Sequence, residues 1–151
     1  MSVEQRLAEI GLVIPDVVPP VAAYVPAVRT GNLVYTSGQL PARDGEMIAV
    51  GKLGDTVTEE VGYDCARQCA INALAAIKAE IGSLDHVKRV VKAVAFVAST
   101  PDFTGQPKVA NGASELLGEV FGEAGKHARS AVGVPVLPLD VPVEVELIVE
   151  V

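Results

Sequence analysis

The sequence predicts an α+β fold of two layers, in which two helices cover one face of a single mixed β-sheet. The predicted elements follow in the order β-β-(β)-α-β-α-β-β. Two segments of about 15–25 residues have the periodicity of long helices, and such helices pack on one face of a sheet to form a two-layer domain. The other face of the sheet is then left for water, a cleft or a neighbouring subunit.

The first strands are expected at residues 23–28 and 33–37. Both segments are rich in β-forming residues, and the Arg-Thr-Gly-Asn between them is a hairpin turn signal. A third short strand is expected near residues 47–50, after the Asp44-Gly45 turn.

The first long helix is predicted from a capping box at residues 56–59 (Thr-Val-Thr-Glu) and is expected to stop at Gly82. Its apolar positions recur with helical spacing, at Val61, Cys65, Cys69, Ala73, Ile77 and Ile81. Cys65 and Cys69 lie four residues apart on that apolar face, which suits a disulfide poorly. We therefore expect two buried thiols.

The middle of the chain predicts a central strand and a second helix. Residues 87–98 are rich in Val, and their near-continuous apolar second half indicates burial on both faces. Pro107 opens the second helix, which is expected to end around residues 122–125.

Two strands close the chain, at residues 129–136 and 141–151. If they form a hairpin about residues 137–140, Arg129 lies opposite Ile148. The odd positions of the last strand are all Val or Leu and face the helices. Its even positions carry three carboxylates, at Glu144, Glu146 and Glu150.

The chain is expected to form one domain over residues 1–151, with residues 1–20 as an N-terminal extension. This extension combines a short amphipathic helix at residues 3–10 with an extended, proline-rich stretch. Hydrophobic residues make up 50% of the chain and aromatic residues only 4%. A single small domain this apolar is expected to bury surface against copies of itself, as a homo-oligomer.

Charge and motifs exclude several function classes. The formal charge of −7 disfavours nucleic acid as a partner, because binding it requires a positive field. Neither His86 nor His127 has a second ligand at a familiar metal spacing, so we expect no metal site and take His127 for a loop residue bonded to backbone. Every apolar run is broken by charges or prolines, so we expect no membrane contact and a cytoplasmic protein.

Arg129 stands out because it enters a strand between Ala128 and Ser130, where burying its charge is costly unless an anion meets it. A glutamate of the acidic sheet face could supply that anion. Alternatively, the guanidinium could hold a substrate carboxylate through two charge-assisted hydrogen bonds. The residues alone leave both possibilities open.

Three motifs resemble those of the reactive-intermediate deaminase family, also called Rid, YjgF-like or endoribonuclease L-PSP. The first is Ala-Arg-Ser-Ala-Val at residues 128–132, followed by Leu-Pro-Leu-Asp-Val at 137–141 and Val-Glu-Val-Glu at 143–146. The second is Gly-Asn-Leu-Val-Tyr-Thr-Ser-Gly-Gln-Leu-Pro at residues 31–41. The third joins Phe96-Val97 to Asp102-Phe103 and the helix after them.

The resemblance implies a chorismate-mutase-like fold assembled as a homotrimer, with a cleft between each pair of subunits. It implies hydrolysis of 2-aminoacrylate-type enamines, or their imine tautomers, to a 2-keto acid and ammonia, without metal or organic cofactor. Arg129 matches the arginine that holds the substrate carboxylate, and Glu144 the glutamate that positions the attacking water. The positions expected to line the cleft are Tyr24, Ser37, Gly38, Asn111 and Ala131.

Two departures bear on activity. Many deaminases have Cys where this chain has Ala131, and Glu where it has Gly133, so we expect a less polar and roomier cleft. With its N-terminal extension and a longer loop at residues 105–109, the chain resembles a divergent branch of the family. The alternatives to a deaminase are a non-catalytic carboxylate-binding or regulatory trimer and, against the acidic charge, a ribonuclease or translation inhibitor.

Overall fold

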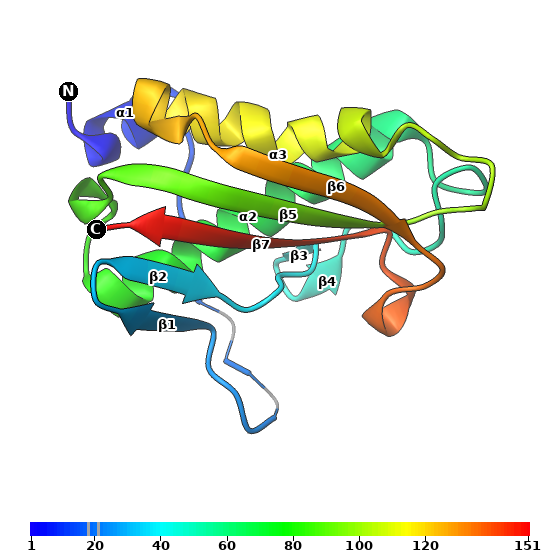
Figure 1. The fold of residues 1–151 in the computed structure, drawn as a ribbon, viewed down its shortest axis with the longest axis horizontal. Helices are drawn as coiled ribbons and strands as arrows, with labels where there is room; N and C mark the ends of the chain where they lie inside the picture. The colour runs from blue at the N-terminus through cyan, green and yellow to red at the C-terminus, as the bar shows by residue number, and fades with distance from the viewer. Residues whose placement is uncertain (18, 21) are drawn as a thin grey trace.

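The computed structural model describes residues 1–17, 19–20 and 22–151, so part of the proline-rich stretch of the N-terminal extension lies outside the described residues. Its five-stranded mixed sheet has the strand order β1-β2-β7-β5-β6, with two long helices stacked on one face (Figure 1). The predicted α+β class is confirmed. The helices and strands are α1 (Val3–Glu9), β1 (Ala27–Thr30), β2 (Leu33–Thr36), β3 (Ala42–Arg43), β4 (Glu46–Met47), α2 (Glu59–Ile81), η1 (Leu84–His86), β5 (Arg89–Ala98), α3 (Gln106–Phe121), η2 (Gly122–Gly125), β6 (Ala128–Val134), η3 (Pro138–Asp140) and β7 (Val143–Glu150).

The last two strands do not form the predicted hairpin. β6 pairs with β5 in parallel and β7 pairs with β5 antiparallel, so β5 lies between them (Figure 1). Arg129 therefore lies beside Ala93 rather than Ile148. Pro135 and Pro138 in the connection remove backbone donors that a tight hairpin would need, and η3 carries the chain across to the far side of β5.

The alternation in β7 sets the two faces of the sheet. Val143, Val145, Leu147 and Val149 are buried under the helices, as predicted. The even positions from Glu144 to Glu150 are half-buried on the open face. In β5, Val94 and Phe96 are also only half-buried there, so the predicted burial of this strand on both faces is wrong within the single chain.

The helix α2 begins and ends almost where the sequence places it. Its N-cap is Thr58, whose side chain accepts from Val61 N, two residues later than the capping box predicts. Gly82 ends the helix with a φ of 89°, as expected. Small residues let α2 and α3 approach closely, because a side chain at Gly112 would overlap the Tyr63 carbonyl.

The shorter predicted elements differ from the structure in their bounds. The first strand covers Ala27–Thr30 rather than residues 23–28. The third strand proves to be a two-stranded ribbon, in which β3 pairs with β4 around the Asp44-Gly45 turn. These segments are short, so local sequence pattern places them less firmly than it places α2.

The predicted N-terminal helix is confirmed as α1, whose Leu7 is buried in the common core beside α3. The backbone amide of Val3 donates to Asp85 Oδ1 at 2.6 Å, which fastens α1 to η1. Within the described part of the chain, no helix is long and apolar enough to cross a membrane.

The two cysteines are buried free thiols on α2, as predicted. Burial raises the pKa of Cys65 to about 11 and that of Cys69 well above its ordinary value. Both side chains therefore act as small core residues and not as nucleophiles.

Candidate functional site

Arg129 lies on the edge strand β6 and points toward the helix layer. It is in register with Ala93, which is buried beneath the helices, and paired residues of adjacent strands point to the same face. Its Nη1 donates to Asn111 Oδ1 at 2.8 Å and to Ser114 Oγ at 3.2 Å, both on α3. Arg129 and Asn111, which were both expected to line the cleft, are therefore in direct contact.

The charge of Arg129 meets no carboxylate within the described residues. Four ion pairs are present there, and none involves this side chain. Its two partners, Asn111 and Ser114, are neutral acceptors. The alternative of an ion pair with a glutamate of the open sheet face is thus not what the chain adopts, and the guanidinium remains available to an external anion.

Behind Arg129, a histidine completes a chain of hydrogen bonds that the motifs did not reveal. His127 Nε2 lies 2.9 Å from Ser114 Oγ, and His127 Nδ1 lies 2.6 Å from the Gly125 carbonyl. The expected bond from His127 to backbone is confirmed, and the residue lies in the connection just before β6, but it contacts a polar side chain as well. These residues line a surface hollow of about 330 Å³, formed by Ser114, Gly118, Gly125, Lys126, His127 and Arg129.

The next two positions of β6 on the helix side are Ala131 and Gly133. Ala131 is half-buried, two residues beyond Arg129 on the same face. A Cβ at Gly133 would lie 2.8 Å from Ser99 Oγ and 2.9 Å from Gln106 Nε2. Gly133, Ser99 and Gln106 together line a cavity of about 560 Å³, and the expectation of a roomier and less polar cleft stays a prediction.

Glu144 lies on the open face of the sheet, in contact with Gly38. A Cβ at position 38 would overlap the present position of Glu144 Oε1, so the glycine lets this carboxyl lie against the backbone. Desolvation by burial raises the pKa of Glu144, and the neighbouring Glu146 raises it further. A carboxyl of this kind exchanges a proton more readily near neutral pH than an exposed one.

The remaining predicted residues lie in segments next to the part of β7 that carries Glu144. Ser37 Oγ donates to the Val25 carbonyl at 2.6 Å, which holds residues 24–26 beside the end of β2. Tyr24 precedes Val25 and is 53% exposed. Gln39 pairs with Val145, which brings Gly38 and Ser37 next to β7.

The predicted site residues thus form two groups on opposite faces of one sheet. Arg129 points to the helix side with Ala93, whereas Glu144 pairs with Phe96 on the open side. Asn111 and Ala131 belong with the arginine, and Tyr24, Ser37 and Gly38 belong with the glutamate. A single chain cannot bring both groups to one small ligand, because the sheet separates them.

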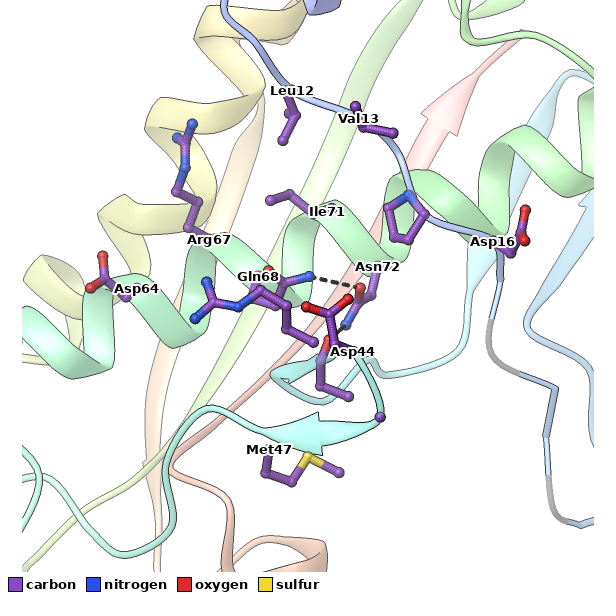
Figure 2. A pocket seen from close by; sticks show the side chains of 14 residues that line it. Leu12, Val13, Asp16, Asp44, Met47, Asp64, Arg67, Gln68, Ile71 and Asn72 are labelled. Atoms are coloured by element: carbon purple, nitrogen blue, oxygen red, sulfur yellow. Dashed lines mark hydrogen bonds between the residues drawn. The ribbon is translucent and has the colours of Figure 1, made fainter.

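A cavity of about 970 Å³ contains none of the predicted site residues in its lining. It lies on the outer side of α2, between the N-terminal segment and the β3–β4 ribbon. Figure 2 shows Leu12 and Val13 across from Ile71, with Gln68 bonded to Asn72. Asn72 also donates to the carbonyls of Leu40 and Ala42, so these amides hold the ribbon in place.

No group of three or more His, Cys, Asp or Glu side chains in the part of the chain that the structure describes lies close enough to hold a metal ion.

Together, these features define a two-layer α+β protein whose edge strand carries an arginine held by two neutral side chains. The family model described as "YjgF/chorismate_mutase-like, putative endoribonuclease" matches residues 4–151. The chain therefore belongs to the YjgF, or Rid, family, as its motifs predict.

Individual relatives cover nearly the whole chain. Protein TCP17 of Trypanosoma cruzi is 45% identical over 149 residues, which is 98% of this chain and 93% of that protein. A 2-iminobutanoate/2-iminopropanoate deaminase of Dermatophagoides farinae is 33% identical over 86% of this chain and 87% of its own length. A crystal structure of a protein of unknown function from Agrobacterium tumefaciens is 44% identical, with a TM-score of 0.92 over 99% of this chain and 92% of that one.

Proposed function

We propose that the protein hydrolyses reactive 2-imino acids, or their enamine tautomers, to 2-keto acids and ammonia. The main observation behind this proposal is that the Arg129 guanidinium is held by two neutral oxygens and meets no carboxylate of the described chain. The similarity to a named 2-iminobutanoate/2-iminopropanoate deaminase supports the same substrate class.

The proposed reaction needs an oriented substrate and one activated water. Arg129 holds the substrate carboxylate through charge-assisted hydrogen bonds, which fixes the position of the neighbouring imine carbon. Water adds to this carbon while Glu144 accepts one of its protons and passes it to the imine nitrogen, which gives a carbinolamine. Glu144 then takes the carbinolamine hydroxyl proton and delivers it to the nitrogen, so that ammonia leaves as the C–N bond breaks, the keto group forms and the carboxylate is regenerated. The imine carbon is already electrophilic, so this sequence uses neither metal nor organic cofactor.

The proposed catalytic unit is a homotrimer whose clefts lie between copies. Because Arg129 and Glu144 lie on opposite faces of the sheet, one copy must supply the arginine group and a neighbour the glutamate group. Apolar residues exposed on the open face support such contacts, since Val28, Tyr35 and Val132 are 51%, 43% and 44% exposed. Closed rotational symmetry would repeat the same cleft at each interface.

The activity is tested by generating 2-iminopropanoate enzymatically and following ammonia release. We expect Arg129→Ala to lose at least about tenfold in kcat/KM, because a charge-assisted bidentate contact is removed. Lys108→Gln, at an exposed position of α3, is the control for loss of one positive charge. Equal rates for the Arg129→Ala protein and the unmodified protein would exclude the proposal.

The sharing of the site is tested by complementation. Arg129→Ala and Glu144→Ala chains are co-expressed with different affinity tags, and the mixed assemblies are purified through both tags. Each mixed trimer that carries both tags contains one cleft of three in which both groups are intact, so activity should reach up to about a third of that of the unmodified protein. Mixed assemblies as inactive as either variant alone would show that each copy acts by itself.

A second candidate, a non-catalytic carboxylate-binding trimer, is favoured by Ala131 and Gly133. Gly133 has no side chain where many deaminases carry a glutamate, and Ala131 has no group that could exchange a proton. In that case, small carboxylates would raise the melting temperature only when Arg129 is present, without turnover of any imine.

A further inference from the structure

We propose that His127 is a positioning residue for Arg129, acting through Ser114 to present one particular edge of the guanidinium to a carboxylate. This inference deepens the proposed function and rests on it for the identity of the anion. It starts from a continuous series of four hydrogen bonds that joins the Gly125 carbonyl to Asn111.

The direction of donation along this series of hydrogen bonds is set at Gly125, its buried end. The Gly125 carbonyl can only accept, so His127 Nδ1 carries the hydrogen of that 2.6 Å bond. In the neutral imidazole, Nε2 is then an acceptor, and Ser114 donates its hydroxyl hydrogen to it at 2.9 Å. Ser114 Oγ thereby keeps its lone pairs for Arg129, whose Nη1 donates to it at 3.2 Å.

The close approach of η2 to α3 explains why the series begins at Gly125. This residue is buried, and a Cβ there would overlap the Leu117 carbonyl of α3. Glycine therefore lets the backbone run against the helix, with its carbonyl oxygen two residues ahead of His127. The imidazole and the serine then lie between the two elements that carry Arg129 and Asn111.

The series selects the edge of Arg129 that can bind an anion. A guanidinium has five N–H donors, and Nη1 uses both of its own on Asn111 and Ser114. The donors that remain are the Nε hydrogen and the two Nη2 hydrogens. A carboxylate must therefore dock side-on against Nε and Nη2, with the ring of His127 and the amide of Asn111 behind the group.

A matched set of variants separates this role from simple packing. His127→Phe keeps a ring of similar size but removes the acceptor for Ser114. His127→Gln places an amide oxygen near the position of Nε2 and should rescue the orientation. Ser114→Ala removes the link itself, and the double variant with His127→Phe completes a thermodynamic cycle.

The first readout is the dissociation constant of 2-oxobutanoate by calorimetry. We expect His127→Phe to weaken binding about three- to tenfold, the size expected when one hydrogen bond to a charged group is lost. Because His127 acts through Ser114, the same change in the Ser114→Ala background should alter the constant by less than about twofold. An equal weakening in both backgrounds would overturn the proposal.

The second readout does not depend on a ligand. Rotation of the Arg129 guanidinium about its Nε–Cζ bond, followed by ¹⁵N NMR in the free protein, should be slow, faster in His127→Phe and slow again in His127→Gln. If the protein binds no carboxylate but shows this pattern, the proposed function fails and the positioning role stands. Rotation that is equally fast in all three proteins would refute the role, whatever the binding data show.

Discussion

At the scale of single residues, the site depends on neutral groups placed beside charged ones. Arg129 could be singled out from the sequence because an arginine in an apolar strand needs a partner. Ser114 and His127 could not, because their contact joins α3 to the connection before β6, thirteen residues away, and follows no local spacing. The family resemblance supplied Asn111 and Glu144, whereas the contact of Ser114 with Arg129 required the structure.

Glu144 gives a pH-dependent prediction for stability. Desolvation and Glu146 raise the pKa of this carboxyl, so the folded chain keeps the proton to a higher pH than the unfolded chain does. Its contribution to stability is therefore present in acid and is lost as the pH rises through the raised pKa.

Glu144→Gln removes this titration, so the variant should unfold at a higher temperature than the unmodified protein at pH 7.5 and at a similar one at pH 4. The side chain is half-exposed, and solvent screening limits the difference to less than about 1 kcal/mol. Melting curves across this range, with Glu150→Gln on the same strand face as the control, measure it. A difference that shrinks with rising pH would contradict the assignment.

At the scale of elements, the sequence predicts helices better than strand pairing. The periodicity of α2 and Gly82 locate that helix to within a few residues, because hydrogen bonds within a helix are local. The order of β6, β5 and β7 depends on contacts between distant segments. The predicted hairpin of β6 and β7 is wrong because β5 lies between these two strands. The core face of β7 was nevertheless predicted, since alternation does not depend on the partner strand.

The contact between α2 and α3 yields a prediction with a built-in control. Gly112→Ala places a methyl group against the Tyr63 carbonyl, which is backbone and cannot move aside without shifting the helix. Gly118→Ala, on the same helix, meets no atom within 4 Å. We expect the first change to cost about 1–3 kcal/mol or more of unfolding free energy, from overpacking.

The second change should add about 0.5–1 kcal/mol, because alanine favours the helix over glycine. Urea unfolding of both variants provides the comparison. Equal stability of the two variants would show that the helices can separate without cost at this point.

At the scale of the whole molecule, the two faces of the sheet have different surroundings. The helix side is filled by a core of small aliphatic residues, and the open side carries exposed apolar side chains among carboxylates. This distribution supports the proposed trimer, because neighbouring copies would cover the apolar side chains that the isolated chain leaves exposed on its open face.

Val132→Glu should disrupt the proposed assembly without unfolding the chain. Val132 is 44% exposed on the open face of β6, where an added carboxylate would be buried beside a neighbouring copy. Val61→Glu, at a 36% exposed position in the first turn of α2, is the matched control. Light scattering after size exclusion should give a trimer for the control and a smaller species for Val132→Glu. Trimers for both variants would place the interface elsewhere.

The placement of Arg129 and Glu144 on opposite sides of one sheet has a consequence for enzymology. Under the proposed arrangement, turnover per chain is not a constant of the polypeptide but rises with its concentration, following the association equilibrium. Dilute or gently warmed preparations should lose specific activity while their circular dichroism is still native. Assays at nanomolar enzyme would then report the strength of the assembly as much as the chemistry.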